Sequence, residues 1–354
     1  MAKAAVPALL PEDAALFASD PARWEVLRGA RIFLTGGTGF VGRWLVTALL
    51  WANAVHRLDA RVELLTRDPS AFRTACPLVT ADQAVTLRRG DVRDVDFADV
   101  HCTHVVHAAT PSDAALNELR PAEMLDIITT GTERMLALAR RVGVRRFLLV
   151  SSGAVYRPPA PHGGYTEDST LGPHWPVETS AYHAGKRAAE RRAAVASEAG
   201  LPVTIARPFA FVGPHLPLDR HFAIGNFVGD ALQGGPVRVT GDGTPVRSYM
   251  YAADMALWLW TMAADERAMG RVYNVGSEQA MTIAETAHLV AQAAGPGISV
   301  TVAQPPAGET GDAYVPSTAR ARRDLGLRQV VGLEEALRRT LAWHRSGGAC
   351  ADAT

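Results

Sequence analysis

Short apolar runs of β type alternate with longer stretches of helical character from residue 30 to residue 207. This alternation is typical of a parallel sheet covered by helices, because each parallel strand needs a crossover to reach the next. The pattern predicts strands at 30–35, 61–66, 84–90, 103–108, 145–152 and 201–207. It predicts helices near 40–55, 121–142 and 180–199. We therefore expect an α/β protein with a doubly wound parallel sheet.

The regular alternation ends after Pro208. Pieces rich in glycine and proline, such as 234–236 and 241–245, then separate shorter elements, which indicates a second, smaller α/β lobe. The predicted division is an N-terminal extension (1–28), a main domain (29–210 with about 250–275), a C-terminal lobe (211–249 and 276–346) and a flexible tail (347–354).

Composition argues against several classes of partner. The 36 Lys and Arg residues balance 36 Asp and Glu residues, so no global field attracts nucleic acid or an acidic membrane surface. No apolar run is long enough to span a bilayer, and the first residues lack the pattern of a secretory signal. We expect a cytoplasmic protein with neither a nucleic acid nor a membrane as partner.

Cysteines and histidines give little support for a metal site. The three cysteines are widely spaced, unlike a disulfide framework or a zinc knuckle. His101, His104 and His107 are three apart, and on a strand that spacing turns neighbouring members to opposite faces. We expect these histidines to be structural, and we expect no metal.

A glycine loop is the first motif with chemical meaning. Gly36, Gly39 and Gly42 follow an apolar strand and open a helix. Backbone N–H groups and the helix dipole can meet a pyrophosphate there, where a β-carbon would obstruct it. The loop predicts a dinucleotide site; a tight turn without a ligand is the alternative.

The end of the second strand bears on the choice of cofactor. An acid there would bind the adenosine ribose of NAD, whereas an arginine accommodates the 2′-phosphate of NADP. The strand ends in Thr66 and Arg67, which favours NADP slightly, although Arg67 can instead be solvated or paired with Asp68. Asp91, just after the third strand, is a candidate partner for the adenine ring.

Ser152, Tyr182 and Lys186 form a candidate catalytic set. Tyr182 and Lys186 are four positions apart on one helix face, so the ammonium can lower the pKa of the phenol and bind the nicotinamide ribose. Ser152 ends a strand at the ligand-binding edge and can donate to a substrate oxygen, while Tyr182 exchanges the proton. Between them, His183 faces either substrate or solvent.

With these residues in view, the chain resembles the extended short-chain dehydrogenase/reductase superfamily, in its group of nucleotide-sugar epimerases, dehydratases and ketoreductases. The resemblance covers about 30–345 and depends on motifs at 35–42, 90–92, 107–109, 151–156, Tyr182 with Lys186, 207–214, 241–249 and 273–276. It implies a Rossmann domain that binds NAD(P) and a C-terminal lobe that binds a nucleoside-diphosphate sugar.

The resemblance also implies roles for individual residues. The implied cofactor contacts are Gly36, Gly39, Phe40, Val41, Gly42, Thr66, Arg67, Asp91, Val92, Ala108, Ala109, Thr110, Tyr182, Lys186 and Pro208. The implied substrate contacts are Ser152, Asn226, Phe227 and Arg247, the last on the diphosphate.

Several positions depart from the family pattern. Dehydratases and decarboxylases of this group usually carry acidic residues just after the catalytic Ser or Thr, and here Gly153 and Ala154 stand there. Ala210 replaces a frequent substrate-contacting asparagine, and Gly185 replaces a common serine. The stretch 305–312 lacks a second arginine that often binds the diphosphate. The nucleotide and the sugar therefore stay open.

The resulting hypotheses share one class of site. The leading hypothesis is an epimerase that works through a transient keto-sugar at C4, and its rival is an NADPH-dependent 4-ketoreductase of a deoxysugar. A dehydratase or decarboxylase ranks lower, as does a reductase of non-sugar ketones, and a non-catalytic NAD(P)-sensing protein ranks last. Helices near 121–142 and 180–199 resemble those of the superfamily's dimer interface, so we expect a homodimer; a monomeric mass in sedimentation would refute it.

Overall fold

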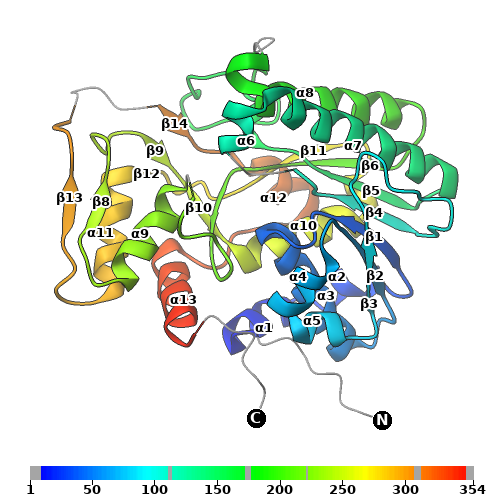
Figure 1. Ribbon diagram of the computed structural model, residues 1–354, viewed down its shortest axis with the longest axis horizontal. Coiled ribbons are helices and arrows are strands. Elements are labelled where there is room, and N and C mark those ends of the chain that lie inside the picture. The colour runs from blue at the N-terminus through cyan, green and yellow to red at the C-terminus, as the bar shows by residue number, and fades with distance from the viewer. Residues whose placement is uncertain (1–8, 111–113, 172–176, 221, 307–311, 348–354) are drawn as a thin grey trace.

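The computed structural model describes residues 9–110, 114–171, 177–220, 222–306 and 312–347. A parallel sheet of seven strands lies at its centre, in the order β11-β6-β5-β4-β1-β2-β3 (Figure 1). This confirms the predicted doubly wound α/β fold. The strands are β1 (Arg31–Thr35), β2 (Arg61–Thr66), β3 (Val85–Arg89), β4 (His104–His107), β5 (Arg146–Val150), β6 (Val203–Pro208) and β11 (Val272–Val275).

Alternate residues of each strand point to opposite sides of the sheet, and helices cover both sides, although the edge strand β3 is only partly buried. Ile32 and Leu34 join a core shared with α3 (Phe40–His56) and α10 (Ala252–Ala264). Phe33 joins a second core under α7 (Pro121–Val142) and α8 (Val177–Glu198). Figure 1 shows these helix pairs on the two sides of the sheet. Shorter helices near the sheet are α4 (Pro69–Ala75), α5 (Pro77–Ala81) and α6 (Ala114–Leu119).

Two differences from the predicted elements have simple causes. The strand β11 pairs with β6 after the chain returns from the second lobe, and with four residues it is too short to show a period in the sequence. The helix α8 begins three residues before the predicted start and contains the non-helical residue Ser180, with φ −165° and ψ 63°.

The second lobe, on the left of Figure 1, is assembled from short strands and helices. Its helix α11 begins with a capping box. The Thr282 side chain accepts from the backbone N–H of Glu285, and the Glu285 side chain accepts from the backbone N–H of Thr282. Among the described residues, no helix is long and apolar enough to cross a membrane. The strands and α-helices after β6, other than α10 and β11, are β7 (Ala210–Val212), α9 (Ala223–Leu232), β8 (Val237–Val239), β9 (Val246–Arg247), β10 (Tyr249–Tyr251), β12 (Met281–Thr282), α11 (Ile283–Ala294), β13 (Val300–Val302), β14 (Ala313–Tyr314), α12 (Ala319–Leu325) and α13 (Leu333–Arg345); of these, α12 lies in the centre of Figure 1, next to β11.

The segment ahead of β1 is docked by aromatic packing. Its helices are α1 (Pro11–Ala18) and α2 (Ala22–Glu25). Phe17 and Trp24 are fully buried, and their ring centroids lie 5.6 and 6.1 Å from that of Trp51 on α3. Residues 1–8 of the predicted extension and 348–354 of the predicted tail lie outside the described residues.

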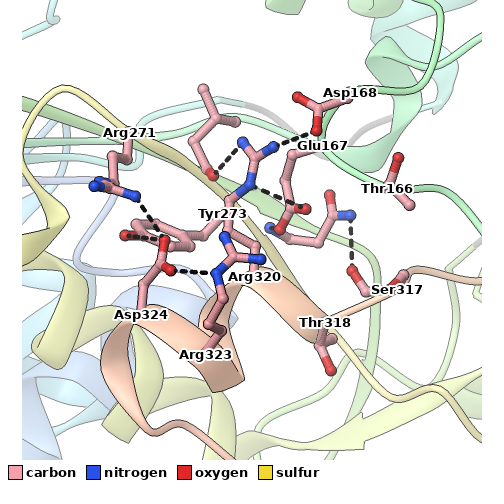
Figure 2. Close-up of polar contacts among 12 residues, drawn as sticks. Thr166, Glu167, Asp168, Arg271, Tyr273, Ser317, Thr318, Arg320, Arg323 and Asp324 are labelled. Atoms are coloured by element: carbon pink, nitrogen blue, oxygen red, sulfur yellow. Dashed lines mark hydrogen bonds and ion pairs between the residues drawn. The ribbon is translucent and has the colours of Figure 1, made fainter.

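Ion pairs fix the second lobe on the first (Figure 2). Arg320 of α12 donates to Asp168 at 2.6 Å and lies 3.6 Å from the carboxylate of Glu167. At the other end of α12, Asp324 accepts from Arg271 at 2.9 Å, next to the start of β11. These contacts hold α12 against β11, at the edge of the sheet.

Candidate active site

The glycine loop joins β1 to α3 beside β4, where the strand order reverses. A Cβ on Gly36, which has a φ of 75°, would lie 2.5 Å from the carbonyl oxygen of Ala108, and a Cβ on Gly42 would overlap the carbonyl oxygen of Gly36. A Cβ on Gly39 would meet only the Gly36 oxygen, at 3.6 Å. Internal packing therefore requires glycine at two positions, and the open space at Gly39 fits a pyrophosphate on the start of α3.

A buried histidine fixes the neighbouring segment after β4. The His107 ring bonds the hydroxyls of Thr35, at 2.8 Å, and Thr132, at 3.2 Å. Thr35 in turn accepts from the backbone N–H of Ala109 at 3.1 Å. Burial, with the charge of Lys186, lowers the pKa of His107 to about 3. Within the described residues, no group of His, Cys, Asp and Glu has the geometry of a metal site.

We expect the His107 ring to stay neutral from about pH 8 to about pH 5. A lowered pKa means that the folded protein resists protonation, so the stability that neutral His107 contributes is lost only as pH falls below the ordinary value of 6.5 towards 3. A titration of the ring resonances by NMR, assigned with His107→Gln, measures this. Protonation of His107 near its ordinary pKa would contradict the buried environment.

The candidate catalytic side chains converge beyond the end of β5. Lys186 donates from Nζ to the carbonyl oxygen of Val150 at 2.8 Å, and the same nitrogen lies 5.8 Å from the ring centroid of Tyr182. Burial raises the pKa of Tyr182, and the nearby Ser152 hydroxyl opposes this rise. The start of this helical turn is fixed by Asn117 of α6, whose side-chain oxygen accepts from the Tyr182 N–H at 2.9 Å.

Burial dominates the electrostatics of this site. It raises the pKa of Tyr182 above its ordinary value, and it lowers the pKa of Lys186 to about 7, against the opposite influence of Glu190. The sequence predicts that the Lys186 ammonium makes the phenol easier to ionise. Burial opposes that effect here, and the influence of Lys186 on the phenol stays a prediction.

Two arginines, Arg43 and Arg67, lie near the predicted adenosine end. Thr66 is buried at the end of β2, and the exposed Arg67 follows it. Asp68 caps α4, accepting from the N–H of Ala71 at 2.9 Å, so capping rather than pairing with Arg67 explains its position. Arg43, in the first turn of α3, donates to the carbonyl oxygen of Thr38 at 3.1 Å and lies 6.0 Å from the Phe72 ring of α4.

Asp91 and Val92, two of the implied cofactor contacts, make other contacts within the protein. The Asp91 carboxylate is bound by Arg93 at 2.9 Å, which lowers its pKa and competes with a role towards adenine. Val92 is 6% exposed and packs where a Cβ on Gly131 of α7 would stand. The side chain of Val92 therefore belongs to the core, and its expected cofactor contact stays a prediction.

The other implied cofactor residues lie at the carboxyl edge of the strands. They occupy the first turn of α3, the segment after β4 and the end of β6: Phe40, Val41, Ala108, Ala109, Thr110 and Pro208. This is the edge at which doubly wound sheets bind ligands.

The implied substrate residues fall into three environments. Asn226 is exposed on α9 and lines a cavity of about 360 Å³ with Asp230 and Arg238. Phe227 is only 3% exposed and belongs to the main core, because α9 turns this side inward; its expected substrate contact stays a prediction. Arg247 is oriented by the carbonyl oxygens of Val246 and Asp312, at 2.8 and 2.7 Å.

Tyr314 of β14 is the main residue that the sequence left unidentified. A Cβ on Gly153 would lie 2.6 Å from its hydroxyl oxygen, so the phenol reaches the catalytic end of β5. Its pKa is raised by burial and by Tyr182, while hydrogen bonding to Ser152 has the opposite effect. The unexpected glycine after Ser152 was the only signal of this contact in the sequence.

A family model for NAD dependent epimerases and dehydratases matches residues 32–276, from β1 to the end of β11. The chain belongs to this family. The match confirms the resemblance to the extended short-chain dehydrogenase/reductases that act on nucleotide sugars. This chain is therefore an enzyme of the NAD-dependent nucleotide-sugar epimerase/dehydratase family.

Similar proteins catalyse different reactions. UDP-glucuronic acid decarboxylase 1 of Arabidopsis thaliana is 29% identical over 89% of this chain and 70% of its own length. The structure of DesIV, a dTDP-glucose 4,6-dehydratase of Streptomyces venezuelae with NAD, has a TM-score of 0.75 and 28% identity over 89% of this chain and 97% of its own. MoeE5 in complex with UDP-glucose and NAD has a TM-score of 0.74 and 25% identity over 90% of this chain and 99% of its own.

Proposed function

We propose that this family member is an NAD(P)-dependent epimerase of a nucleoside-diphosphate sugar, acting at C4 through a transient keto-sugar. The observation that supports this proposal is the convergence of Ser152, Tyr182 and Lys186 beside Gly153, without a carboxylate at positions 153 and 154. Such a site can oxidise and reduce a carbinol, and it lacks the acid that elimination or decarboxylation needs there.

The protein's side chains have separate tasks in this reaction. A bound NAD(P) supplies the uptake and return of hydride. Tyr182 takes the proton of the sugar hydroxyl and returns it to the oxygen of the product, while Ser152 donates a hydrogen bond to that oxygen. Lys186, held at Val150, favours the phenolate by its charge. Arg247 binds the diphosphate and leaves the sugar free to present either face.

The decarboxylase and dehydratase relatives do not determine the reaction of this chain. In the resemblance, those reactions depend on acidic residues after the catalytic Ser or Thr. Here Gly153 stands at that position, and the Tyr314 phenol fills the space that its side chain would enter. We therefore place both reactions below epimerisation.

Product analysis tests the proposed function. The purified protein is incubated with UDP- and dTDP-hexoses, with NAD or NADP added, and the sugar products are identified by NMR. We expect inversion at C4 without net change in the nicotinamide absorbance. Loss of a carboxyl group as CO₂, or formation of a 4-keto-6-deoxy sugar, would overturn the proposal.

A ketoreductase is the second candidate, and the two arginines near the adenosine end favour it. Arg43 and Arg67 together suit the 2′-phosphate of NADPH, which a reductase consumes. Net NADPH oxidation with a 4-keto-deoxysugar would identify this reaction.

Removing Arg67 tests the cofactor preference. We expect Arg67→Ala to raise the Kd for NADPH about 10-fold or more and to leave that for NADH unchanged, because a charge-assisted hydrogen bond to phosphate contributes roughly 1.5–3 kcal/mol. Arg43→Ala should act in the same direction, and Arg73→Ala, on the exposed side of α4, serves as the matched control. Equal losses for both cofactors in titration calorimetry would contradict a 2′-phosphate site.

A further inference from the structure

A single threonine at the end of β1 holds the segment that follows β4. Thr35 is fully buried, and its backbone carbonyl oxygen accepts from the N–H of Ala108 at 3.2 Å. Its hydroxyl oxygen accepts from the next N–H, that of Ala109, at 3.1 Å. The same peptide lies against the glycine loop, since a Cβ on Gly36 would stand 2.8 Å from the Ala109 nitrogen. Thr35 therefore sets how the segment after β4 approaches the start of the glycine loop.

The direction of each hydrogen bond around His107 follows from the number of protons available. Thr132 has one hydroxyl proton and donates it to the carbonyl oxygen of Ile128 at 2.7 Å. In the contact of 3.2 Å between Thr132 and His107 Nε2, the ring must therefore be the donor. The ring is neutral, because burial and the charge of Lys186 lower its pKa to about 3. A neutral ring has one N–H, so Nδ1 carries no proton and accepts from the Thr35 hydroxyl at 2.8 Å.

We propose that Thr35 is a positioning residue of the dinucleotide site, and that His107, in its Nε2–H tautomer, orients the Thr35 hydroxyl by accepting its hydrogen bond. The lone pairs of the hydroxyl then face the Ala109 N–H, and the peptide between Ala108 and Ala109 keeps one orientation beside the glycine loop. Neither side chain takes part in the reaction itself. The proposal rests on the proposed function for its cofactor, an NAD(P), and does not depend on which sugar reaction follows.

The two threonines that bond the His107 ring provide a matched comparison. Both are fully buried, and each bonds one ring nitrogen through its hydroxyl. Thr35 also contacts the segment after β4, whereas Thr132 bonds within its own helix α7. A change to valine removes the hydroxyl at either position and keeps the branched shape. If the hydroxyls served only to stabilise the fold, the two substitutions would act alike on dinucleotide binding.

NMR of the ring nitrogens in the wild-type protein, without ligands, is the first test. The histidines are isotope-labelled, and the His107 signals are identified by their loss in His107→Gln. We expect Nε2 to carry the proton and Nδ1 to carry none at about pH 7. A proton on Nδ1 overturns the proposal, because Thr35 could then not donate to the ring. This measurement leaves Thr35 unchanged, so it tests the arrangement even if Thr35→Val fails to fold.

Dinucleotide binding is the second test, measured by titration calorimetry with NAD and with NADP in the absence of any sugar. We expect Thr35→Val to raise the Kd of the cofactor that the wild type binds by about fivefold, within the range for one lost hydrogen bond. Thr35→Ser keeps the hydroxyl and should restore the affinity, and Thr132→Val should stay within about twofold of the wild type.

Equal rises in Kd for Thr35→Val and Thr132→Val, or no rise for Thr35→Val, overturn the positioning role. Thermal unfolding of each variant shows that it is folded at the temperature of the titration. Because no sugar is present, the outcome is separate from that of the product analysis: a reaction other than epimerisation would refute the proposed function and leave the role of Thr35 intact.

Discussion

Tyr182→Phe is expected to lower kcat by about 10²- to 10⁴-fold, the range in which a positioned acid–base group contributes. The phenyl ring keeps the packing of Tyr182 in the core under α7 and α8, and the backbone N–H still donates to Asn117. The substitution therefore removes the proton-carrying oxygen and little else. Steady-state kinetics on the substrate found by product analysis, with binding of the dinucleotide measured separately, gives the result.

A tyrosine elsewhere in the fold controls for nonspecific effects of this substitution. Tyr273 lies on β11, and its hydroxyl contacts Asp324 of α12, so Tyr273→Phe should leave kcat within about twofold. If Tyr182→Phe keeps more than a tenth of the wild-type kcat while it folds and binds dinucleotide, another group carries the proton. That result would also support the non-catalytic interpretation of the chain.

The sheet could be predicted because its strands, apart from the edge strand β3, are largely buried on both faces. In such a sheet each strand is a continuous apolar run, and helices of clear period separate the runs, so β1 to β6 were found within two residues of their ends. The strands of the second lobe have two or three residues, and β9 is a strand only because it pairs with β12 and β14. A segment of two residues carries no periodicity, so tertiary pairing defines these strands.

The residues of the candidate site likewise divide into those that could be predicted from the sequence and those that could not. Residues within one strand-turn-helix unit, such as Gly36, Gly39 and Gly42, could be identified because their spacing along the chain fixes their geometry. Contacts between distant segments could not. The approach of Tyr314 to Gly153 depends on how β14 lies against the end of β5, and the burial of Phe227 depends on which side of α9 faces the core.

The second large effect concerns a buried ion pair behind the catalytic lysine. Glu190, one turn after Lys186, binds Arg207 at 2.7 Å, with side chains only 7% and 5% exposed. Arg207 also donates to the Tyr156 hydroxyl at 2.9 Å and to the carbonyl oxygen of Glu167 at 3.1 Å. Because Tyr156 donates onward to Asn274 of β11 at 2.6 Å, this network joins the catalytic helix to the seventh strand.

Glu190→Ala is therefore expected to lower the free energy of unfolding by about 3–5 kcal/mol, since it leaves the Arg207 charge buried without its partner. Denaturant unfolding measures the loss, and Glu133→Ala is the matched control, because the exposed Glu133–Arg192 pair between α7 and α8 contributes at most about 1 kcal/mol. Replacing both partners, as Glu190→Leu with Arg207→Met, should cost less than Glu190→Ala alone, because no unpaired charge remains. Similar losses in Glu190→Ala and Glu133→Ala would mean that water reaches Arg207. The network would then not hold the helix of Lys186 firmly on β11.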